Sequence, residues 1–303
     1  MNQSKNHHYI PIFFLKGFCN ENGLIFVYDK KLDKFFPPSI PDRHFFKKHL
    51  NNLIHENKFI TSSEEDVYGP IDNFGTKILK KFIDNKSITD NSTDYDKADL
   101  LKFMINLFWR TPTSDLFLRT LIKKEGLCNS YFGLYNEKTK ERYADDDEEV
   151  QEIKDKILTD KEFAKHLKVI VANSDASNEE IITLLKLWNL FNLNTNSTNE
   201  FLISDLPLLH LNESPTLPNV FKKVIFPISK NKVLILNKNN PKFLDDFTIN
   251  GINLCIMQES ERFVGSGNKD LLEYYVTYYK EVRKKDDTEY SVNELFEYID
   301  NLN

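Results

Sequence analysis

One predicted helix, over residues 94–109, is apolar on almost every side. Its apolar side chains include Leu100, Leu101, Phe103, Met104, Ile105, Leu107 and Phe108. A helix that leaves almost no polar face is covered by other elements of the protein rather than by water. We therefore expect this helix to lie in the core, with the rest of the chain arranged around it.

The remaining pattern predicts further helices and several short strands. Helical spacing of apolar residues covers 70–83, 114–125, 245–259 and 269–283, and a capping box begins a terminal helix at 291. Runs rich in β-branched and aromatic residues predict strands at 24–29, 34–36, 201–205, 224–228, 233–236 and 262–264. These elements predict an α+β fold, mostly helical, with a small mixed or antiparallel sheet that the N-terminal strands share with those of 201–236.

The length of 303 residues allows either one large domain or two ordinary ones, and we expect a single folded domain over residues 1–303. Apolar residues make up 40% and charged residues 28% of the chain, the balance of a globular protein rather than a disordered one. The acidic run 145–149 is read as a loop or a helix start, and an exposed insertion is expected around 127–165.

Charge and cysteine content exclude several classes of protein. The net charge of −6 gives no protein-wide positive field, and paired lysines are dispersed as on a solvated surface. Three separated cysteines without a C-x-x-C spacing argue against a disulfide framework or a cysteine zinc site. With no signal peptide and no membrane-spanning apolar run, we expect a cytoplasmic protein with no membrane partner.

The N-terminal residues His7, His8 and Tyr9 form the first candidate site. Histidine transfers protons near neutral pH, and tyrosine donates a hydrogen bond or orients a phosphate. The alternative interpretation is that one histidine and the tyrosine are hydrogen-bonded core residues that hold the N-terminal segment in place.

Two more residues join this set, each with a structural alternative. Arg110 closes the apolar helix, where a guanidinium needs a carboxylate, a phosphate or free helix carbonyls. Asp205 follows a strand and precedes a Leu-Pro turn, a position used equally by catalytic carboxylates and by aspartates that order their own turn.

This inventory suits two kinds of phosphodiester chemistry. His7, His8, Tyr9, Arg110 and Asp205 could cleave RNA without a cofactor, one histidine deprotonating the 2′-hydroxyl and another acid protonating the leaving oxygen. If Glu65, Asp72 and Asp205 gathered beside His8, the site would instead hold Mg²⁺ or Mn²⁺. The chain contains no P-loop, no G-x-G-x-x-G, no G-x-S-x-G and no H-E-x-x-H, so other common enzyme classes are disfavoured.

Several landmarks along the chain resemble a family of bacterial proteins. They are NHHYIP at 6–11, FL and GF at 14–18, IFVYD at 25–29, FWRTP at 108–112, FLISDLP at 201–207, FPIS at 226–229, and IN and SERFV at 252–264. In this order they resemble the domain of unknown function family numbered 4238. The resemblance implies a part in anti-phage defence, and it marks Asn6, Asn253 and Arg262 as substrate-binding candidates.

One feature of the family pattern departs from the expected geometry here. The family that this chain resembles is expected to have two acidic residues seven apart on one helix, where both would face the same side. The equivalents in this chain are Glu65 and Asp72, but Gly69 and Pro70 lie between them and should interrupt a continuous helix.

Two functions follow as hypotheses. The first is an anti-phage effector that is a nuclease, acting on RNA rather than DNA. The alternative is a non-catalytic sensor that recognises a phage component and acts through a partner, which the low positive charge and the absence of a known catalytic motif favour.

Overall fold

The computed structural model describes residues 6–55, 58–62, 67–84, 92–128, 134–173, 178–193, 199–211, 221–239, 243–284 and 291–302. The described helices are α1 (Ile12–Leu15), α2 (Gly69–Asp84), α3 (Asp94–Arg110), α4 (Ser114–Glu125), α5 (Glu148–Thr159), α6 (Lys161–Asn173), α7 (Asn178–Leu185), α9 (Asp246–Glu259), α10 (Lys269–Lys284) and α11 (Val292–Asp300), with short 3₁₀ turns η1 (Lys16–Phe18) and η2 (Pro41–Arg43). The bounds of α2, α3, α4, α9, α10 and α11 agree with the sequence periodicity to within a residue or two.

The strands form two four-stranded sheets and two ribbons, all antiparallel. The strands are β1 (Asn6–His8), β2 (Ile25–Asp29), β3 (Lys34–Ser39), β4 (Phe46–Lys48), β5 (Asn52–His55), β6 (Lys58–Ser62), β7 (Trp188–Asn192), β8 (Ile203–Ser204), β9 (Leu209–His210), β10 (Val224–Ser229), β11 (Lys232–Leu236) and β12 (Phe263–Ser266). Their orders are β7-β11-β10-β9, β3-β2-β12-β8, β1-β4 and β5-β6. The protein is thus α+β and mostly helical, as the sequence predicts.

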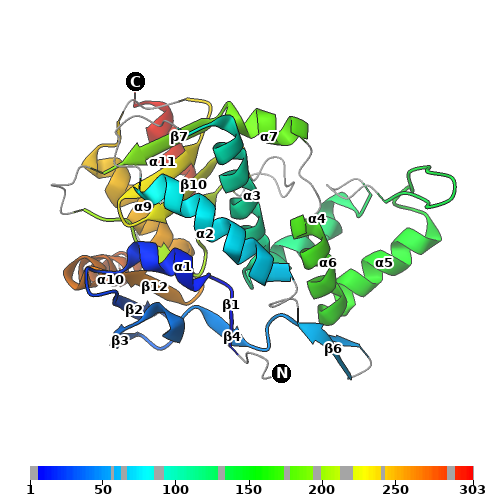
Figure 1. Cartoon of the computed structure of the whole chain (residues 1–303), viewed down its shortest axis with the longest axis horizontal. Helices are drawn as coiled ribbons and strands as arrows, with labels where there is room; N and C mark the ends of the chain where they lie inside the picture. The colour runs from blue at the N-terminus through cyan, green and yellow to red at the C-terminus, as the bar shows by residue number, and fades with distance from the viewer. Residues whose placement is uncertain are drawn as a thin grey trace.

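Helix α3 lies at the centre of the molecule and is covered on several sides (Figure 1). Helices α2, α6 and α7 pack against it, and its apolar residues from Leu100 to Trp109 are largely buried. A capping box at Thr93 begins the helix, with Asp96 accepting from the Thr93 backbone N–H. The expectation of a core helix is confirmed.

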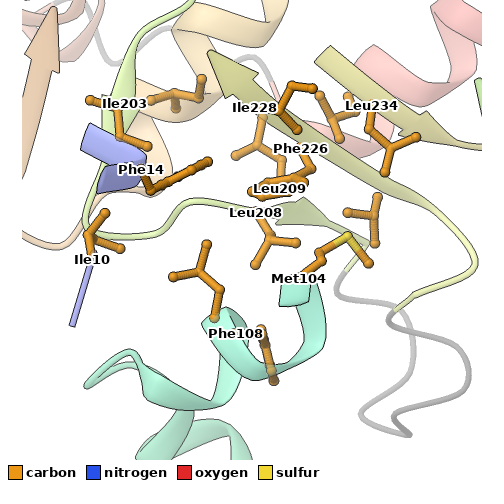
Figure 2. Close-up of a cluster of buried hydrophobic side chains, with 14 of the residues drawn as sticks. Ile10, Phe14, Met104, Phe108, Ile203, Leu208, Leu209, Phe226, Ile228 and Leu234 are labelled. Carbon is orange, nitrogen blue, oxygen red and sulfur yellow. The ribbon is translucent and has the colours of Figure 1, made fainter. Parts of the chain in front are cut away.

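The N-terminal segment is part of the same core. The Phe14 ring stacks on Phe226 of β10 at 5.5 Å and meets the Phe103 ring of α3 at 6.2 Å. Figure 2 shows Phe14 beside side chains of α3, β8, β9 and the hairpin β10–β11. Aromatic packing therefore holds residues 6–18 against both the helices and the strands.

The expectation of one shared sheet is only partly correct. Strand β8 pairs with β12, which pairs with β2, so residues 203–204 do join the N-terminal strands. The hairpin β10–β11 lies in the other sheet, between β7 and β9. The chain changes sheet at the turn after Ser204, because Asp205 is held by the backbone before β12 while β9 goes on to pair with β10.

The segment 134–173 carries α5 and α6, which lie with α4 at the end of the molecule opposite the sheets (Figure 1). The acidic run is the start of a helix, because Asp147 is the N-terminal cap residue of α5 and accepts from Ala144 N–H at 2.8 Å. Asp145 Oδ1 accepts the Cys128 N–H at 2.7 Å, so this run also ties the end of α4 to α5.

The described part of the chain bears on the predictions made for the cysteines and for membrane-spanning helices. Cys19, Cys128 and Cys255 are buried free thiols. Among the described helices, none combines the length and the apolar character needed to cross a bilayer.

Gly75 is required where α2 crosses α3. A Cβ atom at this position would lie 2.5 Å from Cδ2 of the buried Phe103 ring. We expect Gly75→Ala to lower the free energy of unfolding by about 1–3 kcal/mol despite the better helix propensity of alanine, because the ring must move. Urea denaturation measures this. The control is Asn73→Ala on the exposed side of α2, and an increase in stability for Gly75→Ala would contradict the packing.

Candidate functional site

Arg110 is the last residue of α3 and is buried against the start of α2. Its Nη1 donates to Asp72 Oδ1 at 2.6 Å, and the guanidinium lies over the Tyr68 ring, 4.6 Å from its centre. The side chain of Arg110 is 3% exposed and that of Asp72 is 28% exposed. The helix therefore ends on a cation held out of water by a carboxylate and an aromatic face.

A second buried cation lies next to Arg110. Lys168 of α6 donates from Nζ to the carbonyl oxygen of Thr111 at 3.0 Å and to Asp115 Oδ1 at 2.6 Å. Burial lowers the pKa of Lys168, and the charge of Asp115 opposes this shift. Two cations are thus placed around the turn between α3 and α4, each beside one carboxylate.

His7 reaches the same region through β4 and β5. Its ring is buried, and Nδ1 accepts the backbone N–H of Asn51 at 2.9 Å. A nitrogen that accepts this bond carries no proton, so the ring is neutral with its proton on Nε2. The next residue, Asn52, offers its carbonyl to Lys165 Nζ at 3.2 Å, and Lys165 lies one helical turn before Lys168.

We call His7, Lys47, Arg110, Lys165 and Lys168 the basic cluster. Lys47 pairs with His7 in the β1–β4 ribbon and interacts electrostatically with Lys168. The carboxylates Asp72, Asp115 and Glu162 pair with Arg110, Lys168 and Lys165 respectively. Two lysines of α6 therefore contact both neighbourhoods: Lys165 donates to the carbonyl of Asn52, next to the residue that binds His7, and Lys168 donates to the carbonyl of Thr111, next to Arg110.

His8 belongs to the other face of the ribbon. Successive side chains of a strand point to opposite sides, and His8 is half-buried against Phe46, with ring centres 5.5 Å apart. Its Nε2 lies 3.0 Å from the carbonyl of Asp42, to which only an N–H can donate. The two histidines are therefore directed away from each other rather than toward a common substrate atom.

Asp205 lies in a different set of contacts. Its Oδ1 accepts the N–H of Glu261 at 2.9 Å, and its Oδ2 accepts those of Arg262 and Phe263 at 2.7 and 3.0 Å. Burial raises the pKa of Asp205 to about 6, against the lowering effect of these three backbone donors. Both oxygens thus order the backbone that leads into β12.

Arg262 and Tyr9 lie beside Asp205. Arg262 donates from Nε to Oδ2 of the fully buried Asp29 at 2.9 Å. The pKa of Tyr9 is raised, first by burial and then by the charge of Asp205. We call Tyr9, Asp29, Asp205 and Arg262 the Asp205 cluster; it joins β2, β8 and β12 to the N-terminal segment.

The other sequence candidates lie apart from these clusters or beyond the described structure. Asn253 is buried in α9 and joins it to the strand before β8, accepting from Leu202 N–H and donating to the Glu200 carbonyl, both at 2.9 Å. Asn6 is exposed at the start of β1. Glu65 lies outside the described residues, within which no group of three or more His, Cys, Asp or Glu side chains is placed to hold a metal ion.

The candidate residues therefore divide between two places. His7, Arg110 and Asp72 belong to the basic cluster and its partners, while Tyr9, Asp205 and Arg262 belong to the Asp205 cluster. Sequence reasoning missed Lys168 and Lys165. The available signal was a pair of lysines three apart in the segment 161–173, next to the apolar residues Ala164, Leu167 and Val169.

Comparison with known proteins gives one family match. The model of the family described as Protein of unknown function (DUF4238) matches residues 6–270, a range that contains both clusters. No curated protein and no solved structure matches the chain.

Removing one partner of the Arg110–Asp72 pair should have unequal effects. Asp72→Ala leaves a buried guanidinium without its carboxylate, and we expect a loss of about 3 kcal/mol in the free energy of unfolding. Arg110→Met leaves a carboxylate that water reaches, so the loss should be smaller, and the double variant should recover part of the Asp72→Ala loss. Lys81→Ala, in the exposed pair with Asp96, should cost under about 1 kcal/mol. Equal losses for both single variants would contradict the asymmetry.

The three backbone donors around Asp205 make a second prediction. In Asp205→Asn the amide NH₂ must face at least one backbone N–H, which leaves a buried donor unpaired and should cost about 1–3 kcal/mol. Thermal and urea unfolding measure it. Asp246→Asn is the matched control, since Asp246 accepts only an exposed side-chain bond from Asn199 among the described contacts. An unchanged stability for Asp205→Asn would contradict the anchoring role.

Proposed function

The chain belongs to the family described as Protein of unknown function (DUF4238), and for this member we propose that the basic cluster binds RNA phosphates and cleaves RNA in anti-phage defence. The observation that carries the proposal is the burial of two cations near the turn between α3 and α4: Arg110, which pairs with Asp72, and Lys168, which donates to the carbonyl of Thr111. Cations held in a region with little water stabilise the charge that develops on a phosphate in its transition state.

The contacts around the two cations suggest a role for each group. Arg110 presents a planar set of donors that matches a phosphate. His7, with its proton on Nε2, is a donor to a phosphate oxygen rather than a base. Asp72 is partly exposed and is the carboxylate that accepts a proton from the substrate.

The proposed reaction is cleavage through the 2′-hydroxyl of RNA. Asp72 takes the proton of the 2′-hydroxyl, the 2′-oxygen bonds to phosphorus, and the bond from phosphorus to the 5′-oxygen breaks. Lys168 gives its proton to the leaving oxygen, and burial makes it a stronger acid than an exposed lysine because it lowers the pKa. The products are a 2′,3′-cyclic phosphate and a 5′-hydroxyl, and no metal takes part in these steps.

A second function, a sensor that binds a phage component and acts through a partner, is favoured by the pairing of the cluster. Arg110, Lys168 and Lys165 each have a carboxylate partner from a helix of the same chain. Such a network also fixes the packing of α2, α3, α4 and α6 without any chemistry. The two hypotheses make different predictions for a variant that folds normally and keeps the positive charge at residue 168.

Lys168→Arg is that variant. Arginine keeps the positive charge but does not release a proton, so RNA binding should persist while cleavage falls by about 100-fold or more. Purified protein is incubated with total cellular RNA with and without EDTA, and cleavage ends are mapped for cyclic phosphates. RNA from phage-infected cells is tested in parallel.

Lys223→Arg is the matched control, because Lys223 is also a partly buried lysine paired with an aspartate, Asp300, at 3.0 Å. It should cleave like the unaltered protein. RNA that stays intact with the unaltered protein under every condition would refute the nuclease proposal. If Lys168→Arg keeps its fold and its protection against phage, the sensor function is favoured instead.

A further inference from the structure

A cavity of about 750 Å³ lies away from both clusters, between the turn after β2, the end of α9 and the last turns of α10. Its lining residues are Tyr28, Lys30, Lys31, Asp33, Gln258, Glu261, Tyr279, Lys280, Arg283 and Lys284. Five of these side chains are cationic and two are anionic, in a protein whose net charge is −6. The lining of the cavity therefore has a net positive charge, although the chain as a whole is negatively charged.

Part of this charge is fixed in the wall. Lys30 donates from Nζ to the carbonyls of Met257, Gln258 and Ser260 at 2.7, 3.0 and 2.7 Å, at the C-terminal end of α9. Its ammonium also lies 4.8 Å from the centre of the Tyr279 ring. These contacts hold the charge in one position before any ligand arrives, which lowers the entropy cost of binding.

Arg283 adds a second ordered cation. It donates from Nη1 to the Tyr279 hydroxyl at 2.8 Å, and its guanidinium lies 5.5 Å from the centre of the same ring. Tyr279 and Tyr28 are themselves buried, so they support the cavity from below rather than project into solvent. The two ordered cations of the wall, Lys30 and Arg283, thus rest on one aromatic side chain, Tyr279.

The ion pairs of the cavity are exposed, and Asp33 Oδ1 also accepts the Tyr28 hydroxyl at 2.6 Å. Lys31 pairs with Glu261 at 2.6 Å, with about half of each side chain exposed, and Lys280 pairs with the exposed Asp33. Exposed ion pairs contribute little stability, so a ligand with a higher negative charge can replace a carboxylate as the partner of these lysines. A phosphate group carries up to two charges and three strong acceptor oxygens.

We propose that this cavity binds a small phosphorylated anion with at least two phosphate groups, of the nucleoside diphosphate class. The cationic rim suits adjacent phosphates, and the volume falls in the range of small-molecule sites and leaves room for a nucleoside. Tyr279, Lys280, Arg283 and Lys284 lie beyond the residues that the family model matches. The proposal is independent of RNA cleavage.

Calorimetric titration of the whole protein with ADP, pyrophosphate and adenosine tests the proposal. ADP should bind, adenosine should bind at least about tenfold more weakly, and raising the salt concentration should weaken ADP binding. Pyrophosphate that binds as tightly as ADP would show that the phosphates alone are recognised. Absence of binding for both phosphate compounds at millimolar concentration would overturn the site.

Variants locate the binding. Lys280→Gln combined with Arg283→Gln should weaken ADP binding by about tenfold or more, while Lys269→Gln, at the other end of α10, should leave it unchanged. Glu261→Gln removes a negative charge from the cavity without touching the backbone N–H that binds Asp205, and should tighten binding by about threefold or more. This gain cannot come from misfolding. Unchanged affinity in both lining variants, or displacement of ADP by single-stranded RNA at micromolar concentration, would refute a small-ligand site here.

Discussion

Helix α3 buries nearly its whole circumference, and the arrangement of the other elements follows from this burial. An apolar helix of this length must be covered on several sides, and α2, α6, α7 and the N-terminal segment supply the cover. The same burial creates a problem at its C-terminal end, where Arg110 leaves the core without reaching water. Arg110 pairs with Asp72 and lies over the Tyr68 ring, and the neighbouring Lys168 pairs with Asp115. The ion pairs around Arg110 are therefore a consequence of ending a core helix on a cation.

Two sets of polar contacts hold the N-terminal segment, and they divide its candidate residues. His7 is fixed by the backbone of Asn51 on the side of α6, whereas Tyr9 lies with Asp205 and Arg262 near β12. Aromatic packing of Phe14 against Phe103 and Phe226 keeps the segment between the two. The Asp205 cluster uses its carboxylates on backbone N–H groups, which suits an anchor. In the basic cluster the carboxylates Asp72, Asp115 and Glu162 are partly exposed and pair with side-chain cations instead.

The cavity beside α10 differs from the basic cluster in how its charges are held. In the cluster Lys168 and Arg110 are buried, and moving them would disturb the packing of α2, α3, α4 and α6. Around the cavity the ion pairs are exposed and can exchange partners, while Lys30 and Arg283 stay ordered on Tyr279.

The sequence by itself determined the elements and the core helix, because apolar periodicity and capping boxes are local signals. It placed α2, α3, α4, the hairpin β10–β11 and the capped start of α11, and its α+β class is correct. It gave no signal for β4 and β5, which lie in a polar segment of the chain. It also gave none for β7, where apolar and polar residues do not alternate regularly. Only the tertiary structure decided which candidates meet. Arg110 finds Asp72, His7 finds Asn51 and Asp205 finds the backbone of 261–263, because each contact joins residues far apart in the chain and depends on how the elements pack.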